Sequence, residues 1–361
     1  MAKIFYSMAG EGRGHATRVR TLVEDLRKRH ELILLAPGDA YDLLEGAYRG
    51  SEVRVERLPG LRFVYDARQR VHYPRTLLRS AKYLRGLPEL KRQLGQRFER
   101  ERADLLITDY DPGAPRAAEA VGLPYMAVDH QSLFNFGDLS FLPRGLRLRA
   151  AGIARFNRLY YQRQVHTVSS SFFKPEPKPG VQRVTFVGTL LRPALLAARV
   201  EAGDHAVAYC RRSMPSNVLE ALAGLPIEVR VFGLGEAAER GNLRFRAISE
   251  QGFIADLCSA RCVIGTAGNQ LIGEALYLGK PVFALPEAGQ YEQEVNGHLL
   301  ERMGGGTFLA PEALRREPLQ RFLSELPRYA GTVDREFAAG NRRALEAIEA
   351  VLSGLPAAVS V

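Results

Sequence analysis

The sequence is poor in the features that mark secreted and membrane-spanning chains. It holds three cysteines in 361 residues and no tryptophan, and so few cysteines do not make a disulfide framework. Cys258 and Cys262 stand four apart, but no further Cys or His cluster completes a metal site, so core positions are the better interpretation. No apolar run reaches the roughly 18 residues of a membrane-spanning helix, and the N-terminus lacks a signal peptide. We therefore expect a cytoplasmic protein.

Basic residues outnumber acidic ones in one half only. Residues 1–180 contain 31 Lys and Arg against 20 Asp and Glu, whereas residues 181–361 contain 19 against 20. Residues 139–175 have no acid at all, and helical spacing gathers arginines of this segment on one face. The excess favours an anionic partner for the first half, such as the inner face of the cell membrane or a phosphorylated acceptor. A plain solvated surface remains the alternative.

Short apolar runs alternate with amphipathic segments along most of the chain. Such continuous apolar strands separated by helices are typical of parallel sheets covered on both faces. The runs of the first half are Lys3 to Met8, Glu31 to Ala36, Val53 to Leu58, Asp104 to Tyr110, Pro124 to Asp129 and Val165 to Ser170. Those of the second half are Val184 to Val187, His205 to Cys210, Ile227 to Phe232, Leu243 to Ala247, Cys262 to Gly265 and Pro281 to Leu285.

Three alternating prolines divide the two halves. Pro175, Pro177 and Pro179 cannot continue a helix or a sheet and favour an extended spacer. We therefore expect an acceptor-binding Rossmann-like domain over residues 1–174, a linker over 175–180 and a second Rossmann-like domain over 181–330. Ligands of open parallel sheets bind beyond the carboxyl ends of the strands.

The first such end carries a turn that reads G-x-G-x-G-H over residues 10–15. This spacing departs from the dinucleotide fingerprint, and the second strand ends in Ala36-Pro37 without the expected acid, which disfavours a nicotinamide dehydrogenase. Gly12, Arg13 and Gly14 would let a substrate approach the backbone, and His15 beside the helix start is a candidate general base. Asp109, at the end of another strand, is the candidate partner for its second ring nitrogen. Capping or structural roles stay open for both side chains.

The second half has a turn suited to phosphate. Thr266, Gly268, Asn269 and Gln270 lead from a strand into a helix, whose first N–H groups and dipole attract an anion. Glu274 follows within reach of ribose hydroxyls, and Arg192 could neutralise a diphosphate. Glu292 and Gln293, expected on a loop after the next strand, would bind the donor sugar. No Asp-x-Asp pair stands in a suitable setting, so we expect neither a metal nor another cofactor.

These segments together resemble the GT-B glycosyltransferases. The resemblance is closest to the branch of undecaprenyl-lipid N-acetylglucosaminyltransferases and related family 1/28 enzymes. It rests on Gly10 to His15, Val128 to Ser132, Gly188 to Arg192, Phe253 to Asp256, Gly268 to Glu274 and Glu292 to Asn296. The family's Gly-Gly-Ser phosphate loop is not kept: residues 209–214 read Tyr-Cys-Arg-Arg-Ser-Met.

The resemblance implies two domains facing across a cleft, with a last helix in 331–361 that crosses back to the first domain. It implies an inverting, metal-independent transfer of a sugar from a nucleotide-sugar, with UDP as the expected nucleotide and GlcNAc or a hexose as the sugar. Backbone groups of a turn expected at Phe253 and Ile254 would meet uracil, and His15 with Asp109 would form the base dyad. The acceptor stays open between a lipid-linked or cell-envelope glycan and a soluble molecule, and nucleic acid is disfavoured as a partner.

Two other functions remain open from the sequence. A nucleotide-sugar 2-epimerase or hydrolase could use the same fold, and it would change the donor without any acceptor. A non-enzymatic protein that binds anionic surfaces would use only the basic half. Its binding would survive replacement of His15 and would be lost at high salt.

Overall fold

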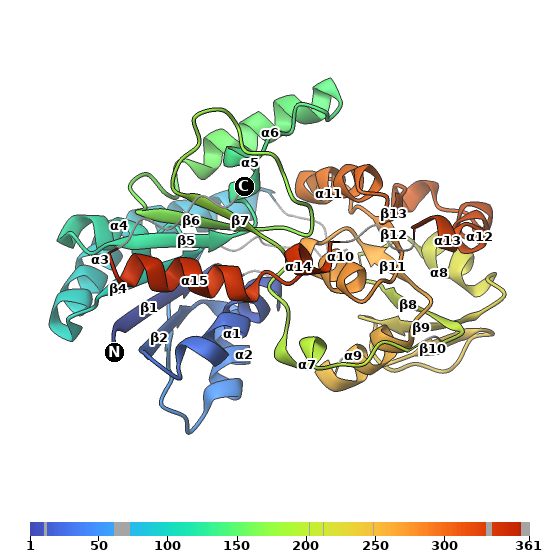
Figure 1. Ribbon diagram of the computed structural model, residues 1–361, viewed down its shortest axis with the longest axis horizontal. Coiled ribbons are helices and arrows are strands. Elements are labelled where there is room, and N and C mark those ends of the chain that lie inside the picture. Colours follow the sequence, from blue (N-terminus) through green and yellow to red (C-terminus); the bar gives the residue numbers. More distant parts are fainter. Residues whose placement is uncertain are drawn as a thin grey trace. The chain divides into compact units, whose positions relative to one another are not determined.

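The computed structural model describes residues 1–10, 13–60, 73–201, 203–211, 213–247, 249–329 and 334–354. The chain divides into two compact units. The first unit comprises Met1–Phe141, Arg147–Arg192 and Gly340–Val361, and the second comprises Leu142–Leu146 and Pro193–Ala339. Each unit is built on its own parallel sheet (Figure 1).

The first unit contains a seven-stranded sheet in the order β3-β2-β1-β4-β5-β6-β7, and its neighbouring strands pair in parallel. The strands are β1 (Lys3–Met8), β2 (Glu31–Ala36), β3 (Arg54–Arg57), β4 (Leu105–Asp109), β5 (Tyr125–Asp129), β6 (His166–Ser170) and β7 (Val184–Val187). The helices are α1 (Arg13–Leu26), α2 (Gly38–Tyr48), α3 (Tyr73–Glu101), α4 (Ala114–Val121), α5 (Ser132–Phe136), α6 (Arg144–Asn157) and α15 (Asn341–Leu352).

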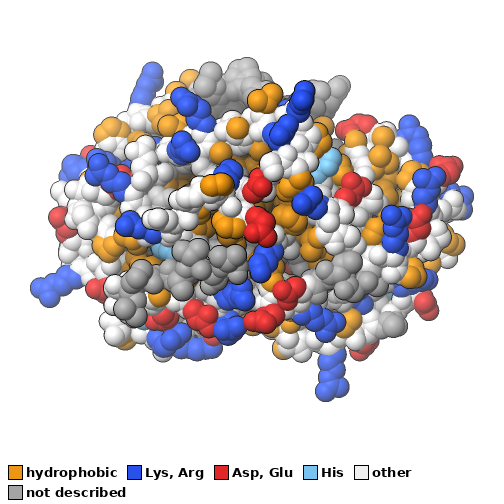
Figure 2. Space-filling model, turned by 45° about the horizontal axis from the view of Figure 1, so that its top comes forward, with side chains coloured by type: hydrophobic (Ala, Val, Ile, Leu, Met, Phe, Trp, Pro, Cys, Tyr) orange, Lys and Arg blue, Asp and Glu red, His pale blue; other side chains and the backbone are white. Residues whose placement is uncertain are grey.

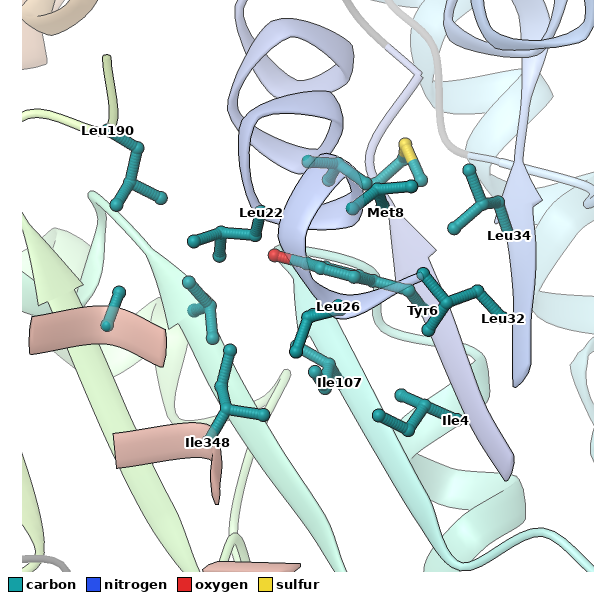
Figure 3. Packing of buried hydrophobic residues seen from close by; sticks show 14 of the residues in the cluster. Ile4, Tyr6, Met8, Leu22, Leu26, Leu32, Leu34, Ile107, Leu190 and Ile348 are labelled. Carbon is teal, nitrogen blue, oxygen red and sulfur yellow. The ribbon is translucent and has the colours of Figure 1, made fainter. Parts of the chain in front are cut away.

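Helices cover both faces of this sheet because its strands are apolar on both sides. Along β1, Ile4 and Tyr6 join one buried cluster and Phe5 joins the other, as the two-residue period of a strand requires. Figure 3 shows Ile4 and Tyr6 packed with Leu22 of α1 and with Ile348 of α15. The last helix therefore completes the core of the first unit, as the fold class predicted.

The expected linker is not where the two units separate. Strand β7 pairs with β6 as the last strand of the first sheet, and the units divide after Arg192. Residues 175–180 pack on the first unit: Lys178 Nζ donates to the carbonyl oxygens of Phe134 and Asn135 at 2.7 and 3.0 Å. The proline spacing indicates an extended segment. Which sheet the following strand joins depends on contacts between residues that lie far apart in sequence, and the spacing does not record these.

The second unit contains a six-stranded parallel sheet in the order β10-β9-β8-β11-β12-β13. Its strands are β8 (His205–Tyr209), β9 (Glu228–Phe232), β10 (Leu243–Phe245), β11 (Cys262–Thr266), β12 (Val282–Leu285) and β13 (Gly306–Phe308). Its helices are α7 (Pro193–Leu196), α8 (Ser216–Ala223), α9 (Glu250–Ser259), α10 (Asn269–Tyr277), α11 (Tyr291–Arg302), α12 (Arg316–Ser324), α13 (Leu326–Tyr329) and α14 (Arg335–Ala338), with a 3-10 turn at Pro311–Ala313. The three-residue strand β13 was not expected, since a run this short carries almost no pattern.

The three cysteines are buried and unpaired, in agreement with a core role. None of the helices within the described residues is long and apolar enough to cross a membrane.

Candidate active site

The carboxyl ends of the first sheet bring His15 and Asp109 together. His15 lies in the first turn of α1, and Asp109 is the last residue of β4, next to Met8 at the end of β1. The backbone N–H of Ala9 donates to the Asp109 carbonyl oxygen at 2.8 Å, which ties the Gly-rich turn to this strand. His15 Nδ1 then lies 3.0 Å from Asp109 Oδ1. The side chain of Asp109 is fully buried, whereas that of His15 keeps 14% of its surface exposed.

A third side chain, which sequence reasoning missed, completes this cluster. Arg18 stands one turn after His15 on α1, and its Nε and Nη2 atoms donate to the two oxygens of Asp109 at 3.2 and 3.0 Å. The i, i+3 spacing of His15 and Arg18 on one helix face was the available signal. Burial alone would raise the pKa of Asp109, but Arg18 and His15 outweigh it and hold that pKa below its usual value. Asp109 is therefore ionised near neutral pH.

The Asp109 carboxylate decides the tautomer that we assign to His15. Arg18 Nη2 lies 2.9 Å from His15 Nδ1, and one ring nitrogen cannot both accept from it and donate to the carboxylate. The ionised carboxylate is the stronger partner, so we place the ring proton on Nδ1. This assignment leaves Nε2 as the basic nitrogen, which is the state a general base needs.

Two other buried acids lie at the same sheet edge but have capping contacts. Asp111 accepts from the backbone N–H groups of Gly113 and Ala114 at 3.2 and 2.9 Å, and Asp129 accepts from Ser132 N–H at 2.7 Å. Burial raises the pKa of each carboxyl to about 6. Between Asp109 and Asp111, Tyr110 adopts a left-handed backbone with φ of 59°, a strained conformation for a bulky residue. The pair Asp109 and Asp111 is spaced like a metal-binding Asp-x-Asp, but both are engaged by protein groups.

The remaining residues of the first turn are only partly defined. Gly12 lies outside the described residues, and of Arg13 only the backbone is described, in the first position of α1. Gly14 has no heavy atom within 4 Å of the place where a Cβ would stand, so space is open beside it. Arg192, expected in the second domain, is the last residue of the first unit.

A hollow of about 480 Å³ lies at this edge of the first unit. It is lined by Pro37 after β2, by Arg57 at the end of β3 and by Lys82, Tyr83 and Gly86 on α3. The Tyr83 hydroxyl is buried and has no hydrogen-bond partner within the described part of the chain. The hollow thus combines apolar walls with two cations, Lys82 and Arg57, of which Arg57 is paired with Asp42 at 2.8 Å.

In the second unit, the expected phosphate turn has the predicted form. Thr266 ends β11, Gly268 is the N-cap of α10, and Asn269 and Gln270 form its first turn. Gly268 has an ordinary φ of −75°, and no heavy atom lies within 4 Å of a Cβ built on it. Neither backbone strain nor a close protein neighbour therefore requires glycine here. The missing side chain leaves open space beside the first N–H groups of a helix, which lack intrahelical acceptors.

Side chains behind the turn hold it in place. Asn296 of α11 is fully buried, and its Nδ2 donates to the Ala267 carbonyl oxygen at 2.9 Å. Glu274 is buried on α10 and accepts from Gln270 Nε2 at 2.8 Å.

Glu292 and Gln293 do not lie on a loop, as was expected. They occupy the first turn of α11, which begins at Tyr291. Gln293 is buried and exchanges two 3.0 Å hydrogen bonds with Glu287: Gln293 Nε2 donates to Glu287 Oε2, and Glu287 N–H donates to Gln293 Oε1. Sequence reasoning missed Glu287, which no motif marked.

Phe253 and Ile254 likewise lie inside a helix rather than in a turn. They belong to α9, which is capped by Ser249, and Phe253 N–H donates to the Ser249 carbonyl oxygen at 3.0 Å. The Phe253 ring packs edge-on against Phe232 with a centroid distance of 5.1 Å. The Phe253 N–H is therefore already engaged by the helix.

No group of three or more His, Cys, Asp or Glu side chains suited to a metal ion occurs within the described residues.

The chain has two Rossmann-like units, each with a parallel sheet and a candidate ligand-binding turn where a strand ends. Its last helix returns to the first unit. Together these features define a GT-B glycosyltransferase. A model of glycosyl transferase family 1 matches residues 2–327, and the chain belongs to this family. A glycosyltransferase of Methanosarcina acetivorans is 24% identical, over 92% of this chain and 95% of that protein.

Solved structures share the fold at low identity. The glycotransferase of kitacinnamycin matches 96% of this chain and 98% of its own with a TM-score of 0.67 and 18% identity. LpCGTa, solved in complex with UDP, matches 98% and 99% with a TM-score of 0.65 and 17% identity. MurG of Acinetobacter baumannii matches 98% and 99% with a TM-score of 0.56 and 14% identity.

Proposed function

We propose that this glycosyltransferase transfers a sugar from a UDP-sugar to an acceptor hydroxyl with inversion and without a metal, and that His15 is the base. The observation that carries the proposal is the 3.0 Å contact between His15 Nδ1 and the buried, ionised Asp109. This contact fixes the ring and leaves Nε2 to take up the acceptor proton. Nε2 takes the acceptor's proton, the acceptor oxygen bonds to the anomeric carbon, and the bond from that carbon to the diphosphate breaks. A single displacement of this kind inverts the anomeric centre.

On the donor side, the open space at Gly268 and the helix start behind it support binding of the diphosphate. Glu274 is proposed to bind the ribose, and Glu292 with Gln293 the sugar. Helix-terminal N–H groups together with Arg192 would neutralise the leaving diphosphate in place of a cation. UDP is proposed as the nucleotide because the fold neighbour LpCGTa was solved with it.

The test is UDP release from UDP-GlcNAc and UDP-glucose with a panel of alcohol and phenol acceptors. His15→Ala is expected to lower turnover at least about a hundredfold, the usual range for a lost general base, with UDP binding unchanged. His30→Ala is the matched control, because His30 is bonded to Ala2 and Glu349 away from the turn. Unchanged turnover in His15→Ala contradicts the assignment of the base. Conversion of the donor in the absence of any acceptor favours the epimerase or hydrolase instead.

We further propose that the acceptor binds in the hollow formed by Pro37, Arg57, Lys82, Tyr83 and Gly86. Lys82 suits an anionic acceptor, and Arg57, which is paired with Asp42 at 2.8 Å, adds a second cation to the lining. Gly86→Leu should fill the hollow and raise the acceptor KM while leaving UDP affinity unchanged. No heavy atom lies within 4 Å of a Cβ at Gly86 or at the helical control Gly46. Equal effects of Gly86→Leu and Gly46→Leu on the acceptor KM would rule the hollow out.

Helix α6 supports a peripheral contact with an anionic membrane. Its outer face exposes Leu148 (76%) and Phe156 (50%), which helical spacing places between the arginines of the same face. The helix contains four arginines and no acid (Arg144, Arg147, Arg149 and Arg155). In Figure 2, which brings the upper part of Figure 1 forward, blue Lys and Arg side chains stand among orange hydrophobic ones. Exposed apolar residues bordered by cations are typical of helices that lie in a bilayer surface.

Sedimentation with phosphatidylglycerol vesicles tests this contact. A variant with Leu148→Ser and Phe156→Ser keeps every charge, and it should sediment several-fold less than the wild type. Phosphatidylcholine vesicles should bind neither protein appreciably, because the attraction to an anionic surface is missing. Equal sedimentation of variant and wild type contradicts the proposal.

A further inference from the structure

Glu287 connects the segment after β8 to helix α11 in the second unit through polar contacts. It follows β12 and has four polar contacts, three through its side chain and one through its backbone N–H. Ser213 Oγ donates to Oε1 at 2.8 Å, Arg211 Nη1 lies 3.1 Å from Oε2, and Gln293 Nε2 donates to Oε2 at 3.0 Å. The fourth is the 3.0 Å bond from the Glu287 N–H to Gln293 Oε1, which fixes the same amide from the backbone. The Glu287 side chain is 14% exposed, whereas that of Arg211 is 51% exposed.

Sheet order places the Arg211–Glu287 ion pair across the phosphate turn. Arg211 follows β8 and Glu287 follows β12, and β11 lies between these two strands. Adjacent strands stand about 4.8 Å apart, so the ends of β8 and β12 are separated by roughly 10 Å. A long arginine and a glutamate together span that distance. The ion pair therefore crosses the carboxyl end of β11, where the chain continues into Ala267 and Gly268.

We propose that Glu287 is an internal anion that holds Arg211 at the phosphate turn, and that the diphosphate of the donor replaces it as the partner of Arg211. The proposal rests on the proposed function, since it requires a nucleoside diphosphate at Gly268. Arginine prefers the paired oxygens of a phosphate, and a diphosphate carries more charge than one carboxylate. A partly exposed ion pair contributes little stability, so the exchange costs little. Arg211 is half exposed and can move, while Ser213 and Gln293 keep Glu287 in place.

Two consequences distinguish this exchange from a purely structural role. Glu287 stays close to the bound diphosphate, so its charge weakens donor binding, and removing that charge strengthens it. The effect depends on phosphate, so a nucleoside without phosphates is insensitive to the change. Glu287 is thus a positioning residue, which orients Gln293 and holds Arg211 without touching the reacting atoms.

The experiment measures UDP binding by calorimetry and uridine binding by saturation-transfer NMR. Glu287→Gln keeps the shape and an acceptor oxygen, and it should tighten UDP binding about threefold to tenfold, as expected for loss of one nearby like charge. Arg211→Gln should weaken UDP binding at least about tenfold, the usual effect of losing a charged phosphate contact. Uridine affinity should not change in either variant. Glu301→Gln is the matched control, because it removes the same charge near the far end of α11, where Glu301 accepts from Thr307.

The outcomes separate this inference from the proposed function. A wild type that binds neither UDP nor another nucleoside diphosphate overturns both. Binding by the wild type with unchanged or weaker UDP affinity in Glu287→Gln overturns the exchange alone, as does an equal change for uridine. If Glu287→Gln folds poorly, Arg211→Gln decides, because its half-exposed side chain contributes little to the core. Unchanged UDP affinity after loss of Arg211 then refutes the proposal.

Discussion

Substitution of Gly268 should change UDP affinity while leaving the free energy of unfolding almost unchanged. Its φ of −75° and ψ of 137° are accessible to any residue, and a methyl group built on it meets no heavy atom within 4 Å. At the N-cap, glycine is better than alanine by roughly 1 kcal/mol. Alanine in turn stabilises by about 0.4–1 kcal/mol through a less disordered unfolded chain. The two effects offset each other, so Gly268→Ala should change the free energy of unfolding by no more than about 0.5 kcal/mol.

Binding should respond far more strongly than folding. The added methyl group occupies the space through which a diphosphate would approach the first N–H groups of α10. We expect UDP affinity to fall at least about tenfold, equivalent to roughly 1.4 kcal/mol.

The matched control lies at the other end of the same helix. Gly279 also has no heavy atom within 4 Å of a Cβ, but its φ of +70° is left-handed. Gly279→Ala should therefore destabilise the protein by about 1 kcal/mol without changing UDP affinity. Urea unfolding and calorimetric titration with UDP measure the two quantities for both variants. If Gly268→Ala binds UDP as tightly as the wild type, the diphosphate does not use this turn.

Three further predictions concern buried polar groups. Burial raises the pKa of Asp129 to about 6 from 3.8, so the folded state binds its proton more tightly than the unfolded state. Stability associated with that proton is present below about pH 4 and is lost as the pH rises through about 6, so Asp129→Asn should stabilise by about 2–3 kcal/mol at pH 8 and little at pH 4 in urea unfolding. Equal effects at both pH values would contradict this reasoning. Arg18→Met leaves the Asp109 carboxylate buried without its cation, and should cost about 3–5 kcal/mol at pH 8 and less at pH 5, where the carboxyl can take up a proton; a loss that does not depend on pH would point to packing instead. Asn296→Ala removes the donor to the buried Ala267 carbonyl oxygen. It should lower the free energy of unfolding by about 1–3 kcal/mol and weaken UDP binding. A variant with normal stability and normal UDP affinity would show that the turn does not depend on Asn296.

Much of the fold could be predicted because parallel sheets have a strong sequence signature. The strands of both units are continuous apolar runs. Strand β1 has the bounds of its predicted run, and β11 ends one residue beyond its predicted run. Helix starts were less well predicted. Glu292 and Gln293 were expected on a loop and Phe253 in a turn, yet both segments lie in helices. Helix boundaries depend on caps such as Ser249 and on packing of the helix, which a local pattern records only weakly.

The candidate site divides in the same way. His15, Asp109, Gly268 and Glu274 could be named because chemistry at strand ends and helix starts has a local spacing. Arg18 and Glu287 could not, because their importance lies in partners 91 and 74 residues away, Asp109 for Arg18 and Ser213 for Glu287.

The sequence by itself determined the class of fold and supplied the candidate residues at the strand ends and helix starts. Local propensity and hydrophobic periodicity are properties of neighbouring residues, so they can be read from the sequence. Only the tertiary structure decided that β7 closes the first sheet, that Arg18 neutralises Asp109 and that Glu287 joins Arg211 to Gln293. Sheet order and buried charge pairing depend on which distant segments meet, and that choice is made by the free energy of the whole packed chain.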